Sequence, residues 1–444
     1  MRHKSLLFVV VAVLAFGLSV VSNAPAQSGS EDYYITVSPF LQKIPLAVPH
    51  FKIAAGSESD AENARAAADL LAGSLEFTGY FKLLDRAAFL YNPQSSGVLA
   101  AELNFQNWSV IGTELLTTGY FEQTGDTVRL ELRLFDIVKA QRVLGKRYTG
   151  PVGNIRSMIH RFCSEVVFYL TGSKGFFQSK IAFVSNGSGS KEIYTCDFDG
   201  RNLARLTYHE SISLSPAWSS DGRWLAYTSY KAGKPDIYIR NLLSGEETAV
   251  ARKGINITPA WVPGKFELAA TLSYSGDQEI YLLTGKGKVI KKLTGKLGID
   301  LSPAWSPDGT KLAFVSSRSG NPQIYILDVG SGNVQRLTYE GGYNTQPSWS
   351  PRGDKIAYSS RTDGRFNIFV IGADGQNMMQ LTAEAGDNES PSWSPDGSLI
   401  AFHSTREGPS RLYVMTALGT DQRRLLRLNG EQTNPKWSSN TFNN

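Results

Sequence analysis

The spacing of six tryptophans predicts that most of this 444-residue chain forms a six-bladed β-propeller. They follow one another at intervals of 43 or 44 residues, each in the frame Pro-x-Trp: Trp218, Trp261, Trp305, Trp349, Trp393 and Trp437. A fixed period of about 40 to 50 residues is typical of propellers, in which one repeat forms one four-stranded blade. Mixed helix and strand patterns precede the repeats. We therefore expect a β-dominated protein with a small N-terminal α+β domain followed by the propeller.

The first 26 residues have the pattern of a secretory signal peptide. A basic stretch at residues 2–4 precedes an apolar stretch at 6–21, and Ala24-Pro25-Ala26 fits a small-residue cleavage site. An uncleaved membrane anchor is the alternative, but the apolar stretch is short for a span of about 20 residues. We expect cleavage on export, which leaves residues 27–45 as a flexible N-terminal segment of the mature chain.

Residues 46–170 read as the α+β domain. We expect a strand from Leu46 to Phe51, then a helix that opens with the capping box Ser59-Asp60-Ala61-Glu62 and ends near Phe77. Further strands are expected at 81–84, 115–123, 127–135 and 141–148, and apolar spacing predicts a closing amphipathic helix at 155–170. Residues 171–179 form a short linker.

The propeller repeats contain a short segment whose residue types predict a tight turn. In Ser306-Pro307-Asp308-Gly309, Pro presets φ, Asp bonds locally and Gly accepts a positive φ. The turn joins a strand that carries the Trp to a strand of the type Leu-Ala-Phe, and two more strands follow. We expect the tryptophans to pack between blades, because a large ring at one position per blade buries roughly 150 to 250 Å².

The two ends of the propeller, expected at residues 180–440, complement each other. The first repeat opens at residues 180–185 with a second strand, whereas the chain finishes at residues 434–438 with a first strand. We expect the C-terminal strand to complete the first blade, which closes the ring and leaves no exposed sheet edge.

Charge and cysteine content restrict the function classes. Loss of Arg2 and Lys4 would leave 43 basic and 40 acidic residues, which is too balanced to argue for nucleic acid. Cys163 and Cys196 are the two cysteines. A bridge between them is permitted in an oxidising compartment. We favour two buried free thiols, since both lie in apolar stretches. Paired Cys-x-x-Cys motifs for zinc are absent from the sequence.

With these parts assigned, the chain resembles the TolB family of the Tol–Pal envelope system of Gram-negative bacteria. The resemblance covers essentially the whole mature chain. It rests on the signal peptide, the opening Ile-Pro-Leu-Ala-Val-Pro at residues 44–49, the junction Leu-Thr-Gly-Ser-Lys-Gly-Phe at 170–176, and the six Pro-x-Trp repeats. Many propellers share such repeats, so the order of the parts, with closure by the C-terminus, is the more specific feature.

The resemblance implies a periplasmic scaffold that is not an enzyme and needs no cofactor, metal ion or catalytic residue. Its partners would be the lipoprotein Pal, bound at the mouth of the propeller channel, and TolA, bound through the N-terminal segment. Such a protein supports outer-membrane integrity and constriction during cell division. The N-terminal segment contains the alternating residues Tyr33, Tyr34, Ile35 and Val37, which suit an added edge strand. An unstructured tail is the open alternative.

Geometry indicates which residues ring the channel mouth. The first strand of each blade lies innermost, so residues that enter it from the preceding loop should face the mouth. These residues are Ser213, Leu214, Asn256, Ile257, Asp300, Leu301, Thr345, Gln346, Asn388, Glu389, Thr433 and Asn434. We expect that reversal of Asp300 and Glu389 to Lys weakens partner capture and leaves thermal stability nearly intact.

Two other function classes remain open. Propeller-capped serine peptidases require a Gly-x-Ser-x-Gly elbow, which the sequence lacks, although a free-standing propeller hydrolase stays possible in principle. An exported propeller that binds a small ligand in its channel is the other alternative. Asp197-Phe198-Asp199-Gly200 hints at calcium but supplies too few oxygen ligands.

Overall fold

The computed structural model describes residues 43–54, 58–90, 92, 95–295, 298–383 and 386–440. All of them fall within a single unit of the chain. The proposed signal peptide and the residues Tyr33, Tyr34, Ile35 and Val37 lie outside the described residues.

The N-terminal domain is built on one mixed sheet. Its strand order is β3-β1-β4-β5-β6, and β2 pairs with β4. The strands are β1 (Ile44–Ala47), β2 (Lys52–Ile53), β3 (Phe81–Leu83), β4 (Leu115–Thr124), β5 (Thr127–Asp136) and β6 (Gln141–Pro151). The long β4–β5–β6 meander matches the predicted hairpin and third strand, because its apolar residues alternate in register.

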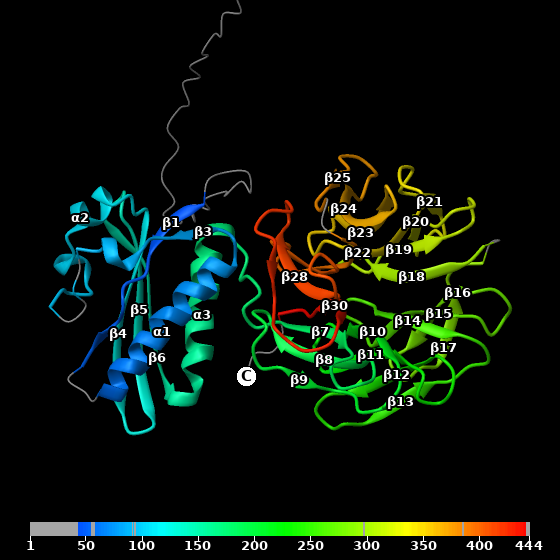
Figure 1. Ribbon diagram of the computed structural model, residues 1–444, viewed down its shortest axis with the longest axis horizontal. Helices are drawn as coiled ribbons and strands as arrows, with labels where there is room; N and C mark the ends of the chain where they lie inside the picture. The colour runs from blue at the N-terminus through cyan, green and yellow to red at the C-terminus, as the bar shows by residue number, and fades with distance from the viewer. Residues whose placement is uncertain are drawn as a thin grey trace, which may run out of the picture. The chain divides into compact units, whose positions relative to one another are not determined.

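Helices cover both faces of this sheet. Helices α1 (Glu58–Phe77) and α3 (Ile155–Thr171) lie side by side on one face (Figure 1). The short helix α2 (Phe105–Val110) packs on the other, where Trp108 joins Phe135 in a separate apolar cluster. Neighbouring β5 residues show the alternation, since Leu134 belongs to the core under α1 and α3 and Phe135 to the core under α2.

Some details of this domain differ from the sequence-based expectation. The strand expected from Leu46 to Phe51 is broken into β1 and β2 around Pro49, whose missing N–H cannot join the ladder. Helix α1 begins at Glu58, so Ser59 lies inside the first turn and is not the N-cap. Helix α2 was not predicted, although Asn104 caps it by accepting a bond from the Asn107 N–H at 3.3 Å. Three short 3₁₀ turns were missed as well: Arg86–Ala88, Ala100–Glu102 and Val152–Asn154.

The propeller has six four-stranded antiparallel blades, as the sequence predicted. Blade 1 contains β30 (Gln432–Trp437), β7 (Lys180–Ser185), β8 (Glu192–Asp197) and β9 (Ala204–Arg205); blade 2 contains β10 (Ser213–Trp218), β11 (Trp224–Ser229), β12 (Asp236–Asn241) and β13 (Glu247–Val250). Blade 3 contains β14 (Asn256–Trp261), β15 (Glu267–Leu272), β16 (Glu279–Thr284) and β17 (Val289–Lys292); blade 4 contains β18 (Asp300–Trp305), β19 (Lys311–Ser316), β20 (Gln323–Asp328) and β21 (Val334–Arg336). Blade 5 contains β22 (Asn344–Trp349), β23 (Lys355–Thr362), β24 (Arg365–Gly372) and β25 (Met379–Gln380); blade 6 contains β26 (Asn388–Trp393), β27 (Leu399–Ser404), β28 (Arg411–Thr416) and β29 (Arg423–Arg424).

Closure of the ring by the C-terminal strand is confirmed. Strand β30 pairs antiparallel with β7, with Trp437 opposite Ile181. In Figure 1 the first strands β30, β10, β14, β18 and β22 lie nearest the centre of the ring. The two chain segments that form blade 1 are therefore separated by 226 residues of sequence, from 206 to 431.

The six tryptophans are structural, as expected. Each is buried, with 6 to 9% of its surface exposed. In four of the six, the indole N–H donates to a backbone carbonyl of the preceding blade. Trp261 donates to the Ala217 carbonyl at 3.1 Å, and Trp305 to the Ala260 carbonyl at 3.2 Å. The same bond joins Trp218 to the Lys436 carbonyl at 3.0 Å. One repeated residue thus links successive blades, which explains its fixed spacing.

The antiparallel order of strands gives the propeller two distinct ends. The loops from a fourth strand into the next first strand, and from a second into a third strand, lie at one end, which we call the crossover face. The remaining turns lie at the other end, the turn face. The turn between β8 and β9 and the turn between β28 and β29 therefore belong to the turn face.

The N-terminal domain contacts the turn face of blades 1 and 6. Phe77, at the end of α1, packs edge-on against Phe198 with ring centroids 5.4 Å apart. Arg423 donates to the Phe77 carbonyl, and Lys43 pairs with Asp421 at 2.5 Å. Cys163 and Cys196 lie in the same core as free, buried thiols, which confirms the favoured interpretation.

Candidate functional site

A narrow channel runs between the first strands of the six blades. Its cavity has a volume of about 110 Å³. Each blade contributes the residue three positions before its Trp and the Pro that follows it. The lining comprises Ser215, Pro216, Thr258, Pro259, Ser302, Pro303, Gln346, Pro347, Ser390, Pro391, Asn434, Pro435 and Lys436.

The backbone at the polar lining positions is unusual in every blade. Six non-glycine residues have a positive φ of 51 to 57°: Ser215, Thr258, Ser302, Gln346, Ser390 and Asn434. At each of them the pairing of the first and second strands shifts register. A left-handed conformation costs roughly 1 to 3 kcal/mol for such residues and clusters at functional sites. The bulge is what turns these polar side chains toward the channel.

Hydrogen bonds join part of this ring from blade to blade. The Asn434 side-chain amide donates to the Ser390 hydroxyl at 3.1 Å, and the Ser390 backbone N–H donates to the Gln346 side-chain oxygen at 2.9 Å. Residues 44 positions apart in sequence are therefore in direct contact at the channel. Because the Gln346 side-chain oxygen accepts the bond from Ser390, its NH₂ group remains available as a hydrogen-bond donor.

Four of the residues expected at the channel mouth are fully buried. Ser213, Asn256, Asp300 and Asn388 are at most 1% exposed, and the side chain of each forms hydrogen bonds within its own blade or to the preceding blade. Asp300 accepts two bonds from Arg318, at 2.9 and 3.1 Å, and Arg406 donates to Asn388 at 3.0 Å. These side chains cannot reach a partner, because they are buried and bond to strands of the same or the preceding blade. The expectation that reversal of Asp300 leaves stability intact is therefore revised.

The remaining predicted residues lie nearer the surface. Leu214, Ile257, Leu301, Thr345, Glu389 and Thr433 occupy one equivalent position, four residues before the Trp, and are half-buried. Gln346 and Asn434 belong instead to the channel lining. In blades 5 and 1 the sequence-based register was one residue late, so it missed the buried Asn344 and Gln432. Counting back five residues from each Trp would have found both.

Glu389 stands out among the half-buried residues because it faces a histidine. It lies opposite His403 in the β26–β27 pair, with the His403 Nε2 3.9 Å from a Glu389 carboxylate oxygen. Burial, with a smaller effect of Asp387, raises the pKa of Glu389, and burial lowers the pKa of His403 to about 4. The histidine is therefore neutral at neutral pH.

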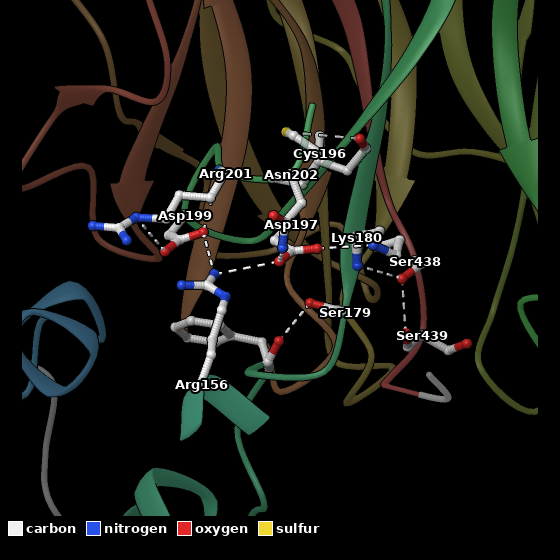
Figure 2. Close-up of polar contacts among 12 residues, drawn as sticks. Arg156, Ser179, Lys180, Cys196, Asp197, Asp199, Arg201, Asn202, Ser438 and Ser439 are labelled. Carbon is white, nitrogen blue, oxygen red and sulfur yellow. Dashed lines mark hydrogen bonds and ion pairs between the residues drawn. The ribbon is translucent and has the colours of Figure 1, made fainter. Parts of the chain in front are cut away.

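A second polar cluster lies where α3 meets blade 1 (Figure 2). Arg156 reaches Asp197 at 3.3 Å and Asp199 at 2.8 Å, and Lys180 holds Asp197 at 2.8 Å. Burial acts to raise the pKa of Asp197, but Lys180, Asn202 and Arg156 together outweigh it and the pKa is lowered. Both carboxylates therefore form ion pairs with side-chain cations of the chain. A cavity of about 600 Å³ lies beside them, lined also by His160.

Comparison with known proteins identifies the family. A model described as the TolB beta propeller domain matches residues 168–441, and one described as the TolB amino-terminal domain matches residues 35–143. The first alone covers more than half of the chain. The chain belongs to the TolB family.

Relatives and a solved structure agree with this assignment. A Tol-Pal system protein TolB of Desulfosudis oleivorans is 57% identical over 278 residues, which are 62% of this chain and 64% of the relative. A protein TolB homolog of Chlorobium chlorochromatii is 48% identical over 56% of each chain. The matched part of the chain thus spans less than two thirds of these relatives. The crystal structure of TolB from Acinetobacter baumannii superposes with a TM-score of 0.79 and 28% identity, over 90% of this chain and 97% of that one.

The residues that the structure describes offer neither a cluster of metal-ligating side chains nor a helix that could cross a membrane. None of these residues forms a group of three or more His, Cys, Asp or Glu side chains placed to hold a metal ion. Among the helices that the structure describes, none combines the length and apolar character required to cross a bilayer.

The junction of the two TolB-family domains should weaken in mild acid. Burial, and next the guanidinium of Arg156, lower the pKa of His160 to about 4. Because the unfolded state then binds the proton more tightly, stability falls as pH drops from about 6.5 toward 4. For one such histidine the loss at pH 5 is on the order of 2 kcal/mol.

Urea unfolding at pH 7.5 and pH 5 would measure this effect in the wild type and in His160→Phe, which keeps a ring against Phe198. Comparison of the two proteins removes the contribution of His403, which both contain. An equal loss of stability in both would show that His160 does not titrate in this way.

Proposed function

We propose that this protein is a non-catalytic periplasmic scaffold of the Tol–Pal system. In this proposal its propeller binds the lipoprotein Pal, its N-terminal segment binds TolA, and the complex supports outer-membrane integrity and constriction during division. Membership in the TolB family supports the proposal, as do relatives whose names place them in the Tol-Pal system. The expected signal peptide at residues 1–26 supports a periplasmic location. The boundaries 27–45, 46–170, 171–179 and 180–440 stay part of the proposal.

The observation that carries the docking proposal is a pair of exposed tyrosines on the crossover face. Tyr208 and Tyr339 are 67% and 74% exposed and follow the same Arg-Leu-Thr sequence in blades 1 and 4. Arg205 stacks over Tyr208 at 4.5 Å, and Arg336 over Tyr339 at 4.8 Å. Tyr and Arg are the residues most enriched at protein-binding hot spots.

These stacked pairs are held in place before any partner arrives. Arg205 donates to the Thr207 carbonyl at 2.7 Å and pairs with the buried Glu192 at 3.1 Å. Arg336 makes the equivalent bond to the Thr338 carbonyl at 2.6 Å. Since little side-chain freedom remains to be lost, binding at these rings costs less ordering entropy.

Further exposed apolar side chains lie in loops of the same crossover face, namely Ile212, Tyr274, Ile299 and Tyr343. The contacts with the N-terminal domain lie at the turn face, so the crossover face is left for a protein partner. The predicted mouth residues fit this surface where they are half-buried, and we propose Leu214, Ile257, Leu301, Thr345, Glu389 and Thr433 as its inner rim. Pal is the partner that the family resemblance implies.

The proposed binding of TolA by the N-terminal segment is supported by the sequence alone. Tyr33, Tyr34, Ile35 and Val37 have the alternation of an added strand, which is the pattern by which peptides extend a sheet edge. Their replacement by Ser should abolish TolA capture and leave Pal capture unchanged.

The channel is too small to favour the alternative of a propeller that binds a metabolite-sized ligand. Sites for metabolite-sized ligands typically enclose about 300 to 1,000 Å³, whereas this cavity measures about 110 Å³. A hydrolase would need a nucleophile activated by a nearby base. Glu389 and His403 come within 3.9 Å, but His403 is 7% exposed and buried in blade 6.

Substitution of the tyrosines tests the docking surface. We expect Tyr208→Ala and Tyr339→Ala each to weaken binding of the soluble domain of Pal by about tenfold or more, because a truncated hot spot costs upward of 1 to 2 kcal/mol. Isothermal titration calorimetry with the full mature chain would measure it.

Leu243→Ala is the matched control, since this side chain is 82% exposed but lies on the turn face. If Tyr208→Ala and Tyr339→Ala leave the affinity unchanged while Leu243→Ala lowers it, the docking site lies on the turn face instead. Failure of the wild-type chain to bind Pal at all would reject the scaffold proposal.

A further inference from the structure

One channel-lining residue breaks the six-fold pattern of the propeller. The position before each Trp is occupied by Ala or Ser in five blades, at Ala217, Ala260, Ala304, Ser348 and Ser392. In blade 1 it is Lys436, which lines the central channel. A small residue has therefore been replaced by a long cation at the one place where six strands converge.

The Lys436 ammonium has no counter-ion within the described ranges of the chain. Its backbone carbonyl accepts the Trp218 indole bond, but no carboxylate lies at ion-pairing distance from its side chain. Burial lowers its pKa, and no neighbouring charge contributes to that shift. Lys436 is half-buried and lines the channel, so its ammonium is partly removed from water without an ion-pair partner, and an anion that enters the channel would gain from its presence.

The rest of the lining offers hydrogen-bond donors. The hydroxyls of Ser215 and Ser302 line the channel on the blades that precede and follow Thr258. The Ser390 hydroxyl accepts a bond from Asn434, which leaves its own hydrogen to donate, and the Gln346 NH₂ group is likewise oriented as a donor.

The charge of the channel lining indicates whether the channel favours an anion or a cation. None of the thirteen lining residues is an Asp or a Glu, so the channel offers one positive charge and no negative one. Metal cations prefer carboxylate and carbonyl oxygens as ligands, and the lining has no carboxylate. The Lys436 ammonium would also repel a metal cation in the same channel. Oxyanions are matched by an ammonium combined with hydroxyl and amide donors.

We propose that the propeller channel binds a single oxyanion, held by Lys436 and by the Ser215, Ser302, Ser390 and Gln346 side chains. The cavity of about 110 Å³ limits the occupant to one phosphate, sulfate or carboxylate group, since a water molecule takes about 30 Å³ of liquid volume. The group could be a free ion or the carboxylate of a small acid. This proposal does not depend on the docking of Pal.

Binding of simple anions to the mature chain tests the proposal. Sodium phosphate and sodium acetate are titrated separately by calorimetry at constant ionic strength, with chloride as the common background. We expect saturable one-to-one binding of at least one of them. Lys436→Met should weaken it by at least about tenfold, because it removes a charge-assisted bond. Phosphate binding alone points to a free tetrahedral ion, and acetate binding alone to a carboxylate.

Two further variants keep the result interpretable. Lys436→Arg retains the cation and should retain binding, and its folding can be compared with that of Lys436→Met by melting. Lys355→Met removes an exposed lysine from the start of β23, outside the channel, and should leave binding unchanged. No saturable binding in the wild type, or binding that survives in a folded Lys436→Met protein, would overturn the proposal.

Discussion

A chain that ends at Asn429 should unfold at least about 10 °C below the full chain and become sensitive to protease within the propeller. Deletion of residues 430–444 removes β30, the first strand of blade 1. Burial of Trp437 alone, at roughly 150 to 250 Å² and 25 cal/mol per Å², contributes about 4 to 6 kcal/mol. For a domain of this size each kcal/mol lowers the melting temperature by about 2 to 4 °C.

The deletion removes other contacts besides the burial of the Trp437 indole, so we expect it to lower stability more than any other change proposed here. Strand β7 would become an unpaired edge, and Trp218 would lose the Lys436 carbonyl that accepts its indole N–H. The Trp437 indole also donates to the Ser179 hydroxyl at 2.6 Å, which ties the strand to the end of the linker. The deletion thus breaks contacts with blades 1 and 2 together.

Calorimetric melting and limited proteolysis would measure the change. A chain that lacks only residues 441–444 is the control, because β30 stays intact in it. If the two truncated chains have the same melting temperature, the ring does not depend on β30 for closure.

Asp300→Lys should destabilise the propeller by about 3 to 5 kcal/mol, which is the usual cost of breaking a buried ion pair by removing one partner. Asp300 is 1% exposed and binds Arg318 through both of its oxygens. The substituted lysine would place a second cation beside the guanidinium, which is already stacked near Phe314 and Tyr325. Urea unfolding would measure the loss.

The chain itself supplies a matched substitution at this position. Asn256, Asn344 and Asn388 occupy the equivalent site in other blades, and Arg406 donates to Asn388 as Arg318 does to Asp300. Asp300→Asn should therefore cost only about 1 kcal/mol. Asp354→Lys, on an exposed turn of blade 5, should stay within about 0.5 kcal/mol. A loss of similar size in all three variants would contradict a specific role for the ion pair.

The repeat was predictable because each blade obeys the same local physics. A buried Trp, which in four blades bonds to the preceding blade, a Pro-containing turn and an alternating third strand recur wherever the sequence repeats them. Closure was predictable for a related reason: an incomplete first repeat and an incomplete last one leave two edges that can only pair with each other. Helix α2 escaped prediction because it is six residues long and held mainly by packing of Trp108.

The channel residues were predictable only in part. Sequence position indicates that the first strand is innermost, but a regular strand would turn its side chains to alternate sides from the entering loop onward. The register shift at Ser215, Thr258, Ser302, Gln346, Ser390 and Asn434 moves the lining two residues further along. The sequence of a single blade does not predict this bulge, since Ser, Thr and Gln are not residues that favour a positive φ.

The amino-acid sequence by itself therefore determined the number of blades, the closing strand and the membership in a family, because these depend on patterns that repeat within one chain. The tertiary structure decided which polar residues are buried supports, such as Asp300, and which face the channel, such as Lys436. That division depends on a backbone bulge and on contacts between blades about 44 residues apart, which form only when all six first strands meet at the centre.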